Sequence, residues 1–228
     1  MMDNAQHSAE GLLRAARMGQ DTVSFESHLA LISHEELVDQ LTSEQANRAF
    51  WINVYNAYSI ILLALGPVDL LKGMVRLRHY SHRRIRIAGH LLSLNDIEHG
   101  MLRHSRIRWS MGYLNKPFPS KLERALRVLA DPRIHFALNC GAVSCPPIAF
   151  YTREGLNNEL DLATRNFLDS DAVFDPKSNL ITLSPLFKWY VGDFGGRSGM
   201  LRFLERYQRI PPGTIPRIAY STYDWTVT

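Results

Sequence analysis

Residues 41–67 read LTSEQANRAFWINVYNAYSIILLALGP, and this stretch decides the fold. Thr42, followed three places on by Gln45, has the pattern of a capping box and predicts a helix start. Gly66-Pro67 predicts the helix end, which gives a helix of about 22 residues. Its second half is apolar nearly all round. That pattern is typical of a helix that runs through the middle of a fold.

Two asparagines, Asn53 and Asn56, interrupt the apolar surface of this helix and lie on one face of it. Burying an amide without partners costs about 1 to 3 kcal/mol, so each amide should bond to a specific group. Two roles fit this requirement. The amides either pin the backbone of neighbouring loops or orient a catalytic group.

The segments that follow predict short strands among further helices. Ile85 and Ile87 alternate with arginines before a turn at Ala88-Gly89, which indicates a hairpin. Capping patterns predict helices after Ser93 and after Ser120. Beyond these, the sequence predicts a buried strand over 133–138, a helix over 152–170, a strand over 179–183, a helix over 199–208 and an extended segment over 214–225.

This order of elements favours an α+β fold over a doubly wound parallel sheet. We expect a single domain in which a long buried central helix is surrounded by several helices and a small, mainly antiparallel sheet. Residues 1–40 would form an N-terminal helical extension, and residues 41–228 would form the domain itself. The composition, with 46% hydrophobic residues in a chain of 228, supplies enough apolar material for one core of ordinary size.

Charge and hydropathy narrow the classes of partner. The 26 basic and 22 acidic residues leave a formal charge of only +4, so we expect no nucleic-acid partner. The basic run 76–86 contains a single stacking residue, Tyr80, and fits a solvated hairpin face better than a binding site. The chain start lacks a signal-peptide pattern, and no run reaches about 18 apolar residues. We therefore expect a cytoplasmic protein without an integral membrane segment, unless a signal peptide has been trimmed.

The only two cysteines lie in DPRIHFALNCGAVSCPP, residues 131–147. On a strand, His135 and Asn139 would share the polar face with Ala137. The chain would then turn through a loop from Cys140 to Cys145. Two cysteines in a chain of this length favour a reduced pair. Zinc bound by His135 and the cysteines, a reversible disulfide, and a purely structural loop are the alternatives, and we expect neither a metal nor a cofactor.

Nucleophilic catalysis by a thiolate needs an imidazole and a group that orients the imidazole. All three residue types occur in this chain, and Asn139 could also supply the amide. Glu98 and His99 are neighbours on a predicted helix and point about 100° apart, so they should not form a directly bonded pair. The candidate catalytic residues are Cys145, Cys140, His135, Asn53, Glu98 and His99.

Several long motifs together resemble the domain of unknown function 547 family: FWINVYNAY, LSLNDIEHGMLR, DPRIHFALNCGAVSCPP, LFKWYVGDF and the closing YDW. The resemblance runs in order from about residue 45 to residue 225. It places the hallmark residues of the family at Trp51, Asn53, Asn56, Glu98, His99, His135, Asn139, Cys140, Cys145, Trp189, Tyr190 and Asp193. The family has been compared with papain-like and transglutaminase-like enzymes, but Asn53 stands here where their nucleophile would begin the long helix.

These observations lead to two functional hypotheses. The first is a cysteine-dependent hydrolase or acyltransferase that acts on an amide or thioester of a small molecule or peptide. Cys145 would be the nucleophile, because Ser144 and Gly141 leave backbone N–H groups near it for an oxyanion. His135 would be the base, oriented by Asn53 or Glu98. The second is a non-catalytic interaction module with a structural His/Cys motif, in which Trp189 and Tyr190 anchor a partner.

Overall fold

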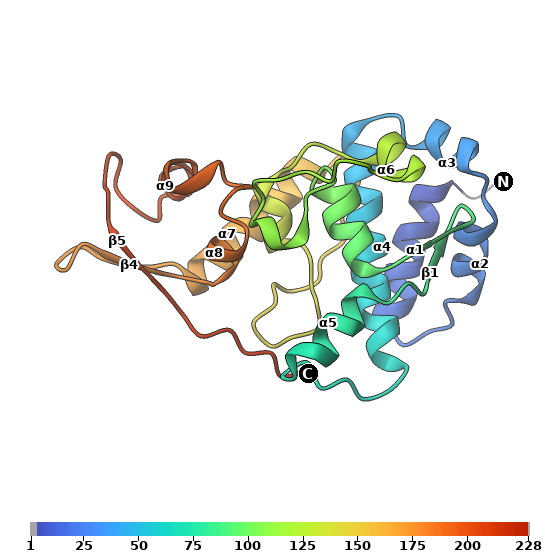
Figure 1. Ribbon diagram of the computed structural model, residues 1–228, viewed down its shortest axis with the longest axis horizontal. Coiled ribbons are helices and arrows are strands. Elements are labelled where there is room, and N and C mark those ends of the chain that lie inside the picture. The colour runs from blue at the N-terminus through green and yellow to red at the C-terminus, as the bar shows by residue number, and fades with distance from the viewer. Residues whose placement is uncertain (1–3, 228) are drawn as a thin grey trace.

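The computed structural model describes residues 4–227, and its centre is the helix α4, Glu44–Ala64 (Figure 1). The predicted long buried helix is confirmed. It begins one residue later than the capping pattern indicated, because the hydroxyl of Ser43 accepts the hydrogen bond from the backbone N–H of Ala46. It ends before Gly66, whose positive φ of 156° stops the helix.

Three N-terminal helices precede α4: α1, Ala5–Arg17, α2, Val23–Leu31, and α3, His34–Gln40. α1 packs against α4, and α2 and α3 pack against α1. Figure 1 shows α1, in blue, running beside α4. Their fully buried leucines belong to the same apolar core as Phe50 of α4. The expected extension is thus helical over the part described, and its first three residues lie outside the described range.

The next segment forms the predicted hairpin and a short irregular helix. β1, Ile85–Ile87, pairs antiparallel with β2, His90–Leu92, and the turn residues Ala88 and Gly89 both have positive φ. Before the hairpin lies α5, Gly73–Ser81, and after it the π-helix η1, Asp96–Leu102. Ser93 begins η1 as predicted, because its hydroxyl accepts from the N–H of Asp96 while the Asp96 carboxylate accepts from the N–H of Ser93.

The second half of the chain contains a small mixed sheet and a second apolar cluster. β4 pairs antiparallel with β3 and parallel with β5, so the fold is α+β with a small, mainly antiparallel set of strands, as predicted. Phe136 and Phe187 lie at the centre of the second cluster. The elements are η2, Arg108–Ser110, α6, Lys121–Leu126, α7, Leu156–Asp171, β3, Val173–Asp175, β4, Leu180–Leu183, α8, Leu186–Trp189, α9, Gly196–Arg206, and β5, Arg217–Tyr220.

The predicted strand over 133–138 is wrong. The segment forms a 3-10 helix, η3, Pro132–Phe136, in which Asp131 caps the backbone N–H of Arg133 and proline occupies the first turn. A short apolar run does not by itself distinguish a strand from a buried helical turn. The alternating faces deduced for His135 and its neighbours therefore do not apply. Instead, Ile134 packs into the α4 core and Phe136 into the second cluster, so η3 joins the two.

The end of the chain returns from β5 to the neighbourhood of α5 (Figure 1). On its way it pairs with the cysteine loop, since Val143 N–H donates to the carbonyl of Thr226 and Ser144 N–H to that of Asp224. No helix within residues 4–227 is long and apolar enough to cross a membrane.

Candidate functional site

A cavity of about 530 Å³ lies between α5, η1, η3, α8, the cysteine loop and the end of the chain. Five of the six candidate residues line it, although they come from three separate segments: Cys140, Cys145, His135, Glu98 and His99. Asn53 is not among the lining residues. The fold therefore brings the polar motif residues of η1, η3 and the cysteine loop to one space.

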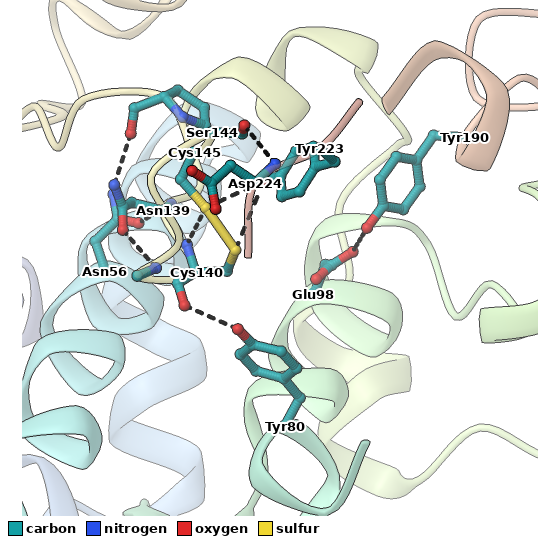
Figure 2. The surroundings of a disulfide bond; sticks show 12 residues. Asn56, Tyr80, Glu98, Asn139, Cys140, Ser144, Cys145, Tyr190, Tyr223 and Asp224 are labelled. Carbon is teal, nitrogen blue, oxygen red and sulfur yellow. Dashed lines mark hydrogen bonds between the residues drawn. A yellow bond between two sulfur atoms is a disulfide. The ribbon is translucent and has the colours of Figure 1, made fainter. Parts of the chain in front are cut away.

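Cys140 and Cys145 form a disulfide (Figure 2), which corrects the expectation of a reduced pair. The Asn139 side chain closes the loop between them. Its oxygen accepts from the N–H of Gly141 at 2.7 Å, and its amide group donates to the carbonyl of Pro146 at 2.7 Å. These bonds hold the two cysteine Cα atoms 6.2 Å apart, within the range that a disulfide spans.

The asparagines of α4 hold the backbone on either side of the cysteine loop. Asn56 accepts from the N–H of Asn139 at 2.9 Å and donates to the carbonyl of Ala137 at 3.0 Å. Asn53 accepts from the N–H of Tyr151 at 3.1 Å and donates to the carbonyl of the same residue at 2.7 Å. Both amides are fully buried and fully paired. Of the two roles considered for them, the structure gives them the pinning role.

The two sulfur atoms have different surroundings. Cys145 Sγ accepts from the N–H of Cys140 at 3.1 Å and from the hydroxyl of Tyr223 at 3.2 Å, whereas Cys140 Sγ lies 3.8 Å from that hydroxyl. Burial raises the pKa of Tyr223, so this phenol keeps its proton and remains a donor. Cys145 is therefore the sulfur that receives two hydrogen bonds at close range.

The backbone donors expected for an oxyanion are occupied. The N–H of Gly141 donates to the Asn139 side chain, and the N–H of Ser144 donates to the carbonyl of Asp224. The first bond is local, whereas the second comes from the return of the chain end, which was not visible in the local sequence. The expectation that these two groups are free is corrected.

His135 is held by Asp193. Its Nε2 donates to Asp193 Oδ2 at 2.9 Å, and its ring stacks on Tyr190 with centroids 3.9 Å apart. Burial disfavours the charged carboxylate, but His135 and Arg103, whose Nε donates to the same oxygen at 2.6 Å, outweigh it and lower the pKa of Asp193 to about 2. An ionised carboxylate only accepts, so Nε2 of His135 carries a proton. Within residues 4–227, no hydrogen bond of Nδ1 is found, and His135 is one of the residues that line the cavity.

Glu98 and His99 form the opposite polar wall. Tyr190 donates its O–H to Glu98 Oε1 at 2.8 Å, and in Figure 2 the Tyr223 ring lies between this pair and the disulfide. Arg103 Nη1 donates to His99 Nδ1 at 2.8 Å, so the His99 proton is on Nε2, and burial lowers the pKa of His99 to about 4. Glu98 Oε1 approaches His99 Nδ1 to 3.4 Å, but a neutral imidazole makes this neither an ion pair nor a hydrogen bond.

The charge of Glu98 is stabilised despite burial. Burial alone would raise the pKa of this carboxyl, but the charge of Arg103 and the hydrogen bond from Tyr190 hold it below the usual range. A π-helix is rare and often marks a functional segment. Here the geometry of η1 lets Arg103 N–H reach the carbonyl of Glu98 at 2.9 Å. The cavity therefore contains one buried carboxylate next to a neutral imidazole.

The residues considered as zinc ligands are engaged elsewhere. His135 bonds to Asp193, and the two cysteines bond to each other. Across the described part of the chain, no group of three or more histidine, cysteine, aspartate and glutamate side chains has the arrangement of a metal site.

Sequence reasoning did not assign roles to Asp193, Tyr223 or Arg103, although all three belong to the site. Each lies in one of the quoted motifs: Arg103 ends LSLNDIEHGMLR, Asp193 belongs to LFKWYVGDF and Tyr223 begins YDW. The motifs therefore contained these three residues. The motifs did not indicate which residues of different segments lie next to one another in the fold.

Comparison with known proteins gives one match. The family model described as a protein of unknown function, DUF547, matches residues 38–168, which is more than half of the chain and includes both cysteines, His135, Glu98 and His99. No curated protein and no solved structure matches the chain. The chain belongs to the DUF547 family.

Proposed function

We propose that the protein, once a dithiol reductant has reduced its disulfide and has itself been oxidised to a disulfide, is a cysteine-dependent hydrolase or acyltransferase that acts on an amide or thioester. Cys145 is the nucleophile. The observation that carries this assignment is the pair of donors on its sulfur, the N–H of Cys140 and the O–H of Tyr223. Hydrogen bonds to a thiolate favour the charged form and lower the pKa of the thiol.

His135 acts as the base. Asp193 fixes the proton on Nε2, which leaves Nδ1 of this cavity-lining histidine to accept a proton. Stacking on Tyr190 fixes the plane of the ring. Asp193 therefore takes the orienting role that the sequence offered to Asn53 or Glu98.

The proposed reaction runs in two steps. The Cys145 thiol gives its proton to His135, and the sulfur attacks the acyl carbon to form a thioester while the departing amine or thiol takes the proton from His135. Water, or a second nucleophile in a transferase, then attacks the thioester and regenerates the thiol. No hydrogen bond joins either sulfur to an imidazole among the described residues. The proton therefore passes to His135 through a cavity water, or the Cys145 side chain, freed by reduction, rotates towards His135 and donates it directly.

The remaining candidates support this centre. Cys140 is the partner that ties up the nucleophile in the oxidised protein and supplies the backbone N–H to Cys145 Sγ. Glu98 and His99 bind the substrate across the cavity, the first through its free oxygen and the second through its Nε2–H.

Limited alkylation tests the assignment. After reduction and removal of the reductant, a low concentration of iodoacetamide at pH 7 should modify Cys145 faster than Cys140 and faster than free glutathione, as measured by peptide mass spectrometry. Tyr223→Phe should slow the reaction at Cys145. An aryl thioester should add one acyl group to the reduced chain, and Cys145→Ser should abolish that addition while Cys140→Ser retains it. Reaction of both cysteines at the rate of glutathione would refute the proposal.

A second candidate is the non-catalytic interaction module. It is favoured by the amides of Asn53, Asn56 and Asn139, all of which bond to backbone groups around the cysteine loop, and by the disulfide that closes this loop. Trp189 and Tyr190 are half-buried and line the cavity, so a partner would have to insert a side chain there to reach them. If the reduced chain forms no acyl–enzyme while Cys145→Ser lowers the free energy of unfolding, this candidate stands in place of the enzyme.

A further inference from the structure

The charged side chains of the cavity are unbalanced. Among the arginine, lysine, aspartate and glutamate side chains of residues 4–227, three line the cavity: Arg76, Arg108 and Glu98. The lining therefore has two positive charges and one negative charge. Glu98 already has Tyr190 as a donor and Arg103 close by. Neither lining arginine has an ion pair in the described residues, since Arg76 donates only to the carbonyl of Leu70 and Arg108 makes no side-chain hydrogen bond.

Aromatic side chains surround these two arginines. The Arg76 guanidinium lies 3.9 Å from the ring centroid of Trp225, whose ring in turn is 5.6 Å from Trp189 and 4.6 Å from Tyr223. The flat guanidinium keeps its edge available for a ligand when its face is stacked. Trp109, which follows Arg108 and also lines the cavity, is 74% exposed. An exposed tryptophan beside an unpaired arginine is typical of a surface that binds a partly apolar anion.

The loop that carries Arg108 and Trp109 is rigid beneath these side chains. The N–H of Gly192 donates to the carbonyl of Met111 at 2.8 Å, and the backbones are so close that a Cβ on Gly192 would stand 2.6 Å from the carbonyl carbon of Gly112. The segment that holds Asp193 against His135 therefore also packs against the residues that follow Arg108 and Trp109.

We propose that the cavity binds an acyl compound that carries a free carboxylate, with Arg108 and Arg76 binding the carboxylate and the tryptophans holding an adjacent flat or apolar group. The acyl part of this statement rests on the proposed function. N-acyl amino acids and peptides with a free C-terminal carboxylate have this chemistry. A planar guanidinium binds a carboxylate through two parallel hydrogen bonds, which gives orientation as well as charge complementarity.

Binding can be tested without any turnover. In the full chain with Cys145→Ser, isothermal titration calorimetry compares three probes of similar size: N-acetylphenylalanine, its uncharged amide, and phenylalaninamide as a cation. We expect the carboxylate to bind at least about tenfold more tightly than the amide, because the carboxylate makes charge-assisted hydrogen bonds with a guanidinium that the neutral amide cannot make. The preference should weaken as salt is added.

Matched variants locate the preference. Arg108→Gln should remove most of it, and Arg76→Gln should reduce it, whereas Arg78→Gln, at an exposed position of α5 outside the cavity lining, should leave it intact. Arg108 is exposed and unpaired, so its variant should fold normally, as circular dichroism would verify. Equal binding of acid and amide, tighter binding of the cation, or a preference unaffected by Arg108→Gln would overturn the proposal.

The two proposals fail separately. If the carboxylate preference is present but the native reduced chain forms no acyl–enzyme, the anion site stands and the cysteine enzyme does not. If the acyl–enzyme forms equally with charged and uncharged probes, the enzyme stands and the anion site does not.

Discussion

His135 and Asp193 are 58 positions apart in the chain and are joined by a 2.9 Å hydrogen bond. No local sequence pattern predicts this bond. His135 belongs to η3 and Asp193 follows α8, so the bond crosses between two elements that the fold sets side by side. Arg103 of the η1 region donates to the same carboxylate oxygen. This three-way contact fixes the orientation of the histidine beside the cavity.

Asp193→Asn should destabilise the protein by about 3 kcal/mol, because removal of one partner leaves Arg103 as an uncompensated buried charge. Denaturant unfolding followed by circular dichroism measures this loss. Asp169→Asn is the matched control, since Asp169 pairs with Arg209 at the surface and its loss should change the free energy of unfolding by less than about 1 kcal/mol. Equal effects of the two substitutions would contradict the buried charge network.

The free energy of unfolding should fall as the pH is lowered from 6.5 towards 4. His99 has a pKa of about 4 in the folded protein against an ordinary value of 6.5, so over this range the unfolded chain binds a proton that the folded chain does not. Asp193 adds a further loss of stability between pH 3.8, which is the ordinary pKa of its side chain, and about pH 2, because the carboxylate stays charged in the folded protein.

His99→Gln isolates the first part of this pH dependence, because a glutamine oxygen still accepts from Arg103 but does not titrate. Relative to the native chain, the variant should lose up to about 3 kcal/mol less stability between pH 6.5 and pH 4. Burial also lowers the pKa of His79 and His90, so the slope is reduced and not abolished. His7→Gln, at an exposed position of α1, controls for the substitution itself. An unchanged slope in His99→Gln would rule out a neutral buried His99.

Asn56→Ala should loosen the cysteine loop. The substitution leaves the N–H of Asn139 and the carbonyl of Ala137 unpaired in a buried place, which should cost about 2 kcal/mol or more. The disulfide should also be reduced more quickly by dithiothreitol, as trapping with an alkylating reagent would record. Asn158→Ala, at an exposed position of α7, is the control. A loop that reacts at the native rate in Asn56→Ala would show that α4 does not hold it.

Gly192→Ala should separate the Arg108 loop from the Asp193 loop. A Cβ at Gly192 would stand 2.6 to 2.8 Å from backbone atoms of Gly112 and Met111, which have no flexible end that could move aside. We expect a loss of at least about 2 kcal/mol, since overpacking and backbone shifts typically cost 1 to 3 kcal/mol. Gly19→Ala, where nothing lies within 4 Å but φ is +63°, reports the cost of backbone strain alone. Similar unfolding midpoints for the two variants would contradict the close approach.

The sequence by itself determined the elements whose causes are local. The apolar periodicity of residues 44–64 and the terminating glycine determined α4, and the caps at Ser93 and Ser120 determined the starts of η1 and α6. The hairpin followed from alternation around a two-residue turn. These features depend on residues within a few positions of one another, so the pattern alone suffices.

Only the tertiary structure decided the form of η3 and the partners of the site residues. A short apolar run satisfies a strand and a buried helical turn equally, and the choice was made by packing, with Ile134 in one core and Phe136 in the other. The partner of His135, the Tyr223 donor on Cys145 and the return of the chain end past the cysteine loop are contacts across 58 to 83 positions. Over such separations, the number of residues between two segments does not predict the distance between them in space, because the packing of the whole core sets the path of the chain.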